Sequence, residues 1–224
     1  VNKKYVVVGK CGTGLFLKYI TFLFGFILLP SSFCLGSAEG DLKRLQYNNP
    51  KLVVDLGVGL WAWPMPMDFD KDGDFDLVVV CPDKPFNGTY FFENKQGNVK
   101  MPVFEPPVRI SKGLQNVQVS YIDGEPRVLS PGVEYTEFFE KGLDTEVALG
   151  VTQKDVYKSR GRTRAKQWKY VDFDGDGLQD IVVGAGDWTD YGWDDAYNDE
   201  GVWTNGPLRG FVFLLKNEGS NESP

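Results

Sequence analysis

Short hydrophobic runs recur along most of the chain, and their residues are those that favour strands. Residues 77–80 read Leu-Val-Val-Val and residues 181–183 read Ile-Val-Val, and β-branched runs of this length are typical of buried strands. Gly, Asp, Asn and Pro separate the runs, and these residues favour turns. The sequence therefore predicts an all-β fold of antiparallel strands, with further strands expected at 61–67, 88–94, 104–110, 117–122, 127–132, 166–171 and 210–217.

Two of the predicted strand pairs enclose nearly identical acidic loops, at 68–76 and 172–180. In both loops Asp occupies positions 1, 3, 5 and 9, and Gly occupies position 6. Carboxylates this close repel one another unless a cation lies among them. Hard oxygen ligands and a Gly that permits a sharp turn suit Ca²⁺. We therefore expect two calcium sites formed by side chains and by two main-chain carbonyls; the candidate ligands are Asp68, Asp70, Asp72, Asp74, Asp76, Asp172, Asp174, Asp176, Leu178 and Asp180, with Asp74 and Leu178 supplying the carbonyls.

The alternatives to this kind of site are an EF-hand and a metal-free surface turn. An EF-hand needs a bidentate Glu at position 12 and a helix on each side. Position 12 here is Val79 or Val183, and both flanks have the strand pattern. A strand–loop–strand hairpin remains, and its repetition with matched flanks favours metal binding over a plain Asp- and Gly-rich turn.

The Asp spacing followed by Leu-Val-Val-Val or Ile-Val-Val-Gly resembles the FG-GAP/VCBS repeat, the calcium-binding blade unit of integrin-α-like β-propellers. The resemblance covers 57–110 and 166–217 and is weak between these ranges. It implies blades of four-stranded antiparallel sheets and structural Ca²⁺. It implies no particular reaction, because one fold hosts many functions.

We expect about three blades, at about 57–110, 115–150 and 160–224. The middle blade has a short turn at 123–126 without the carboxylates, so no calcium is expected there. The last blade ends after its third predicted strand, and propellers typically need four to eight blades to close. The chain is therefore interpreted as an N-terminal piece of a longer propeller, with oligomeric completion of the ring or an open β array as alternatives.

The first 38 residues have the features of a secretory signal peptide. Lysines precede an apolar stretch at 19–29, and Gly36 and Ala38 suit cleavage before Glu39. An uncleaved anchor and a lipid-modified Cys34 are the alternatives. We expect residues 39–224 to be a partial propeller that is secreted, periplasmic or at the cell surface, with membrane contact only through such an anchor.

Composition narrows the function further. The net charge of −7 at pH 7 opposes nucleic-acid binding. The chain contains no His, which removes His-dependent zinc motifs and Ser-His-Asp triads. Removal of residues 1–38 would leave Cys81 alone, so we expect calcium rather than a disulfide to stabilise the exported chain.

An insertion at 186–208, between the second and third strands of the last repeat, combines aromatic rings with carboxylates. Such rings stack on sugar C–H faces, while carboxylates accept hydrogen bonds from hydroxyls. A basic run precedes this repeat, and Arg suits an acidic polysaccharide. The candidate ligand-binding residues are Trp188, Tyr191, Trp193, Tyr197, Trp203, Arg160, Arg162 and Arg164. The alternative is an insertion packed on its own rings and paired with the basic run.

The sequence as a whole predicts an exported calcium-binding propeller module that acts in binding or scaffolding, with a glycan or a cell-surface protein as partner. One alternative is part of a secreted polysaccharide lyase or other carbohydrate-active enzyme, with Tyr157 or Tyr191 as a base. Another is a cell-surface adhesion module. The sequence shows no complete catalytic set, and no residue is assigned a catalytic role.

Overall fold

The computed structural model describes residues 46–47, 57–157, 161–192, 196–222 and 224. These residues form three antiparallel sheets of four strands or fewer, none of which closes on itself. The expectation of an all-β fold is confirmed at this level. The predicted signal peptide at 1–38 lies outside the described residues. Among the residues that are described, no helix has the length and apolar character needed to cross a membrane.

The first sheet has the strand order β2-β3-β4-β6, and its strands are β2 (Trp63–Met67), β3 (Asp76–Cys81), β4 (Gly88–Phe92) and β6 (Val108–Ser111). Strand β3 is buried at every position, which explains why its sequence is apolar without alternation. A separate parallel pair joins β1 (Gln46–Tyr47) to β5 (Val103–Phe104).

The prediction of one strand at 104–110 was partly wrong. The segment divides into β5, which ends at Phe104, and β6, which begins at Val108. Pro106 and Pro107 lie between the two strands. Because proline has no N–H to donate, these residues interrupt the ladder that the apolar pattern suggested.

The second sheet has the order β10-β9-β8-β7, and its strands are β7 (Gln118–Ile122), β8 (Glu125–Ser130), β9 (Val133–Glu134) and β10 (Val147–Ala148). Asp123 and Gly124 form the β7–β8 turn with φ of 53° and 85°, as a tight two-residue hairpin requires. Helix α1 (Phe138–Lys141) follows β9, and α2 (Gln153–Tyr157) follows β10.

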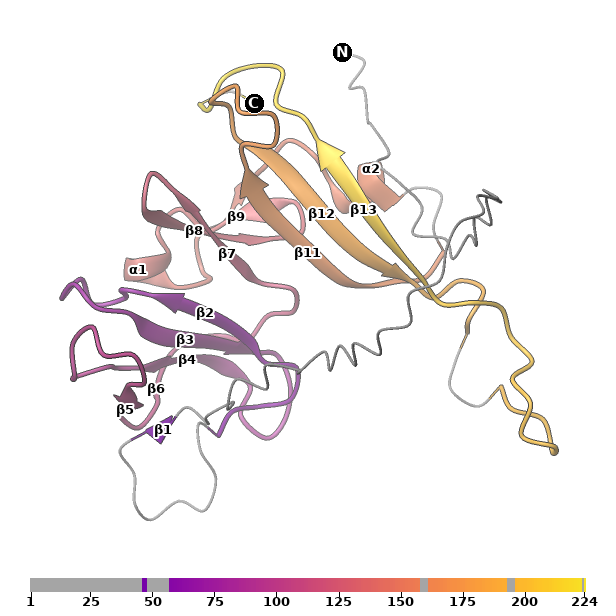
Figure 1. Cartoon of the computed structure of the whole chain (residues 1–224), viewed down its shortest axis with the longest axis horizontal. Helices are drawn as coiled ribbons and strands as arrows, with labels where there is room; N and C mark the ends of the chain where they lie inside the picture. The colour runs from indigo at the N-terminus through magenta and orange to yellow at the C-terminus, as the bar shows by residue number, and fades with distance from the viewer. Residues whose placement is uncertain (1–45, 48–56, 158–160, 193–195, 223) are drawn as a thin grey trace, which may run out of the picture.

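The third sheet has the order β11-β12-β13, with β11 (Thr163–Val171), β12 (Asp180–Asp187) and β13 (Arg209–Leu215). The described residues of this sheet form three strands. The sheets follow one another in chain order, with β2 against β7 and with β7 and β8 against β11 (Figure 1).

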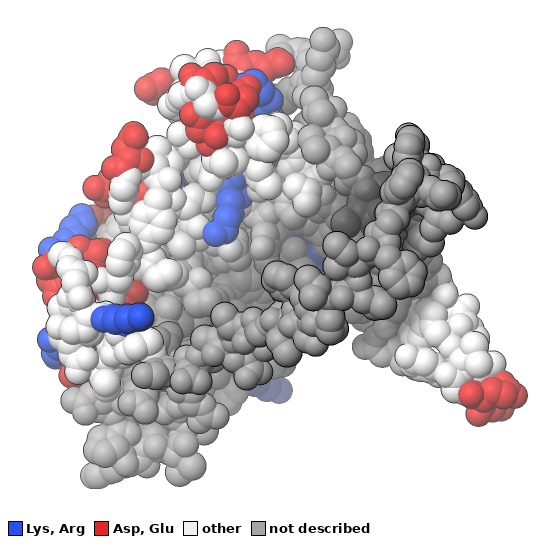
Figure 2. All heavy atoms as spheres, in the orientation of Figure 1, with Lys and Arg blue, Asp and Glu red and all other residues white. Residues whose placement is uncertain are grey.

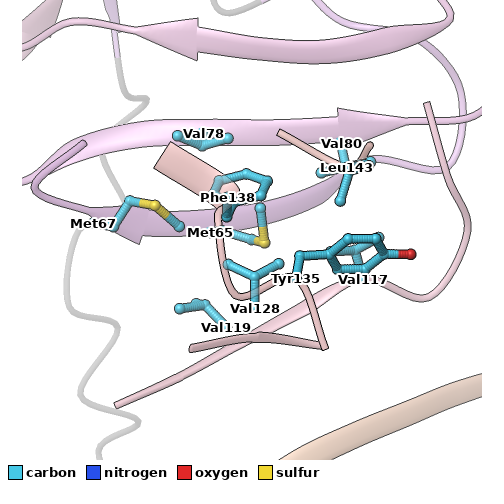
Figure 3. Packing of buried hydrophobic residues seen from close by; sticks show 10 residues of the cluster. All are labelled: Met65, Met67, Val78, Val80, Val117, Val119, Val128, Tyr135, Phe138 and Leu143. Atoms are coloured by element: carbon cyan, nitrogen blue, oxygen red, sulfur yellow. The ribbon is translucent and has the colours of Figure 1, made fainter. Parts of the chain in front are cut away.

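Three apolar clusters pack these sheets, one of them around β3 and Phe92. Between the first two sheets, Met65 and Val78 meet Val128, Tyr135 and Phe138 (Figure 3). The third sheet has its own core, where fully buried Trp168 packs with residues of α2. Each Asp-rich hairpin therefore extends from a sheet whose strands are fixed by packing.

Candidate metal centres

Each Asp loop closes an antiparallel hairpin. The first joins β2 to β3 after the pair Met67–Asp76, and the second joins β11 to β12 after the pair Val171–Asp180. Asp76 and Asp180 begin the second strand of each hairpin and are 2% and 0% exposed. The predicted strand–loop–strand geometry is confirmed, and it places one buried carboxylate at the base of each loop.

The carboxylate at position 1 organises the loop above it. Asp68 accepts hydrogen bonds from the main-chain N–H groups of Asp72 at 3.1 Å and Gly73 at 3.0 Å. Asp172 accepts the equivalent bonds from Asp176 at 3.1 Å and Gly177 at 3.0 Å. The two loops therefore share one internal conformation.

The buried carboxylate at position 9 ties each loop to the third strand of its sheet. Asp76 accepts hydrogen bonds from the N–H groups of Phe69 at 3.0 Å and Asn94 at 2.8 Å. Asp180 accepts the equivalent bonds from Phe173 at 3.4 Å and Asn217 at 2.8 Å. A displacement of the third strand would therefore disturb the loop.

Sequence reasoning assigned no role to Asn94 and Asn217. Each side chain also forms a hydrogen bond with the segment that follows it. The Asn94 side-chain amide donates to the carbonyl of Gly97 at 3.1 Å, and the Asn217 side-chain amide donates to the carbonyl of Ser220 at 3.1 Å. The sequence feature that could have revealed this role is the Asn that follows the third strand in both repeats.

Carboxylate oxygens converge in both loops, but from different positions. In the first loop, oxygens of Asp68, Asp70 and Asp76 all lie within 4.8 Å of one another. In the second loop the converging set comprises Asp172, Asp174 and Asp176. The converging sets thus include six of the predicted ligands. They leave out two predicted side chains, those of Asp72 and Asp180, and the two residues predicted to bind through their carbonyls, Asp74 and Leu178.

The environment of the first loop disfavours the charge that its carboxylates carry. Burial raises the pKa of Asp76 to about 6, although the N–H groups of Asn94 and Phe69 oppose this. Burial and the neighbouring Asp72 charge raise the pKa of both Asp70 and Asp74. A cation among these groups would favour their ionised forms.

Asp74 carries an unsatisfied oxygen. The residue is 6% exposed, and its Oδ1 is buried without a hydrogen-bond partner in the described part of the chain. Buried polar atoms in folded proteins nearly always have a partner, and an exception calls for a ligand, water or ion. The first loop therefore has acceptor capacity that its own donors do not use.

A lysine from outside the second loop contacts the carboxylates of that loop. The Lys216 ammonium contacts Asp174 and lies 2.6 Å from Oδ2 of Asp176. This contact lowers the pKa of Asp176 and raises that of Lys216. Acidic side chains gather at this end of the third sheet (Figure 2). The second loop thus differs from the first in having a basic side chain among its carboxylates.

The insertion between β12 and β13 gathers four of its predicted ligand-binding rings into one cluster. Tyr191 stacks on Trp203 at 4.3 Å between centroids and meets Trp188 edge-on at 5.1 Å. Tyr197 meets Trp203 at 5.0 Å and is 61% exposed. The segment extends away from the sheets as an arm (Figure 1). Most of the rings therefore contact one another.

The structure describes two of the three predicted arginines, Arg162 and Arg164. Arg164 lies over the Trp188 ring at 4.8 Å and over the Trp61 ring at 5.6 Å. The carbonyl of Arg162 accepts a hydrogen bond from the N–H of Trp188 at 2.8 Å. Arg160 and Trp193 lie outside the described residues. The structure thus brings Arg164 to the aromatic cluster.

Two aromatic residues differ from their sequence interpretation. Trp61, which belongs to the strand predicted at 61–67, lies before β2, is 51% exposed and contacts Arg164. Tyr157, considered as a catalytic base, is buried and its hydroxyl accepts a hydrogen bond from the Trp168 indole at 3.2 Å. Burial also raises the pKa of Tyr157, which disfavours the phenolate that a base would need.

No family model, curated protein or solved structure matches this chain. The relationship to FG-GAP/VCBS repeats therefore remains a prediction from the Asp motif.

Proposed function

We propose that this protein is a calcium-stabilised β-propeller module that acts in binding or scaffolding. The observation that carries the proposal is the first Asp loop, where Asp68, Asp70 and Asp76 converge and Asp74 has a buried oxygen without a partner among the described residues. Calcium takes six to eight oxygen ligands and tolerates irregular geometry. This donor set consists entirely of oxygens, so its chemistry fits calcium.

The role of the ion would be structural. Asp76 joins the loop to the N–H that follows β4, and Asp180 does the same after β13. An ion that binds these loops would therefore fix three strands of a sheet together. It would also relieve repulsion among carboxylates that the fold brings close.

The propeller assignment rests on the order and packing of the sheets. Three antiparallel sheets follow one another in chain order, and the acidic hairpins of the first and third share their hydrogen-bond pattern. We propose that the sheets are blades of a β-propeller ring and that the chain is exported.

The test is thermal unfolding of the full chain in millimolar calcium and in EDTA. Extracellular modules bind calcium at about 10⁻⁴–10⁻³ M, so millimolar calcium should raise the melting temperature by linkage. Asp70→Ala and Asp174→Ala should each reduce the shift, whereas Asp123→Ala, in the carboxylate-poor β7–β8 turn, should not. Identical melting curves in calcium and EDTA would exclude the metal assignment.

A second candidate function is glycan binding by the arm. It is favoured by two exposed rings, Tyr197 and Trp61, at the ends of a chain of aromatic contacts that includes Arg164. We propose a neutral sugar, or an anionic one held by the arginine. A glycan array with wild type and Tyr197→Ala tests this; loss of binding at an unchanged melting temperature supports the site, and the absence of any glycan signal in wild type rejects it.

A further inference from the structure

We infer that Lys216 acts as a built-in counter-ion of the second Asp loop, so that calcium must displace its ammonium there but meets no such competitor among the described residues around the first loop. The inference rests on the proposed calcium function and adds a difference between the two sites. Lys216 is the first residue after β13, and its ammonium bridges Asp174 and Asp176.

The structural equivalence of the repeats identifies the counterpart of Lys216. Leu215 pairs with Ile181, and Phe92 pairs with Leu77 at the same place in the first sheet. The next residue is Lys216 in one sheet and Glu93 in the other, and each is followed by the Asn that donates to the buried Asp. A positive side chain thus replaces a negative one at matched positions.

The first loop has no comparable contact among the described residues. Glu93 pairs with Lys95 at 3.2 Å, and besides burial and Asp72 its charge raises the pKa of Asp70. Lys71 is the only basic residue within the first loop, and its ammonium lies over the Phe139 ring at 5.1 Å. The carboxylates of this loop therefore face an added negative charge rather than an ammonium.

The two sites should consequently respond differently to calcium. An ammonium and a calcium ion compete for the same carboxylate oxygens, so the affinity of the second loop is reduced by the free energy of the Lys216 contacts. A displaced Lys216 has space, because it lines a cleft of about 720 Å³ between the second and third sheets. Asp123, Glu218 and Glu222 line the same cleft and offer other carboxylates to the ammonium.

Calcium titration by calorimetry of the full chain tests this in an Asp70→Asn background, which leaves the second loop as the intact site. Lys216→Met should tighten calcium binding by about five- to tenfold, the effect of losing two partly exposed charge contacts. Lys112→Met, which removes a lysine paired with Asp144 at 3.3 Å, should leave the affinity unchanged. An unchanged or weaker affinity in Lys216→Met would overturn the inference.

A second measurement uses the wild-type chain and needs no variant to fold. Acylation of lysines, quantified by mass spectrometry, should modify Lys216 several-fold faster in calcium than in EDTA, with Lys112 equal in both. Calcium binding without any change at Lys216 would contradict the inference and leave the proposed function intact. Absence of calcium binding in wild type and in Lys216→Met would contradict both.

Discussion

Gly73 and Gly177 hold the sixth position of the two loops with φ of 98° and 83°. This conformation lets the N–H of each Gly reach the first Asp of its loop at 3.0 Å. Residues with a Cβ pay a steric cost in the left-handed region. The role of each Gly is therefore conformational.

Gly73→Ala should lower the free energy of unfolding by about 1–2 kcal/mol. The cost is conformational, since an added Cβ at Gly73 would meet nothing within 4 Å. Gly210→Ala is the matched control, because its added Cβ also meets nothing within 4 Å and its φ lies outside the left-handed range. Equal effects of the two variants in denaturant unfolding would contradict this explanation.

Asp76 gives the metal-free protein a specific pH dependence. Its pKa is raised to about 6 from an ordinary value of 3.8, so the folded state binds a proton that the unfolded state releases. This contribution to stability is present below the unfolded pKa and is lost as pH rises through about 6. In EDTA, stability should fall between pH 4 and pH 7 by an amount on the order of 3 kcal/mol from this group.

Asp76→Asn provides the control for the pH experiment, because an amide does not titrate. The slope of unfolding free energy against pH should flatten in this variant. Calcium should also flatten the slope in wild type, since the ion favours the carboxylate. A wild-type slope in EDTA equal to that of Asp76→Asn would contradict the assignment.

At the scale of elements, the second and third sheets are joined by polar contacts across their interface. Glu134 on β9 is 5% exposed, pairs with Arg127 on β8 and accepts a hydrogen bond from the Tyr170 hydroxyl on β11 at 2.9 Å. The main-chain N–H of Tyr170 also donates to the Ser120 hydroxyl on β7 at 3.0 Å. The two sheets are thus fixed in register as well as packed.

Glu134→Ala should destabilise the protein by about 2 kcal/mol, because it leaves the half-buried Tyr170 hydroxyl and the Arg127 guanidinium without this acceptor. Tyr170→Phe removes one hydrogen bond and should cost about 1 kcal/mol. Chemical denaturation of both variants measures the difference. A smaller loss in Glu134→Ala than in Tyr170→Phe would show that the carboxylate does not join the sheets.

The local elements could be predicted from the sequence, and the contacts between distant segments could not. Apolar runs and Asp spacing located both hairpins, because each depends on residues close in the chain. The roles of Asn94 and Lys216 depend on β4 and β13 returning beside the loops, which no local pattern encodes. The contact of Trp61 with Arg164 likewise joins segments far apart in the chain.

At the scale of the whole molecule, the sheets are arranged so that each acidic hairpin is supported by the core of its own sheet. Calcium binding to one loop should therefore stabilise that sheet first and the neighbouring sheets through their interfaces. The β7–β8 turn has no matching carboxylates, so we expect the middle sheet to gain stability from calcium only through its contacts with β2 and β11. We propose that two sites, and no third, bind calcium in the described sheets.

The most direct test is the number of calcium ions bound per full-length chain at saturating millimolar calcium, measured by equilibrium dialysis and elemental analysis. We expect two ions in wild type, one in Asp70→Ala, one in Asp174→Ala and two in Asp123→Ala. A count of one or none in wild type, or a loss of calcium in Asp123→Ala, would contradict the proposal.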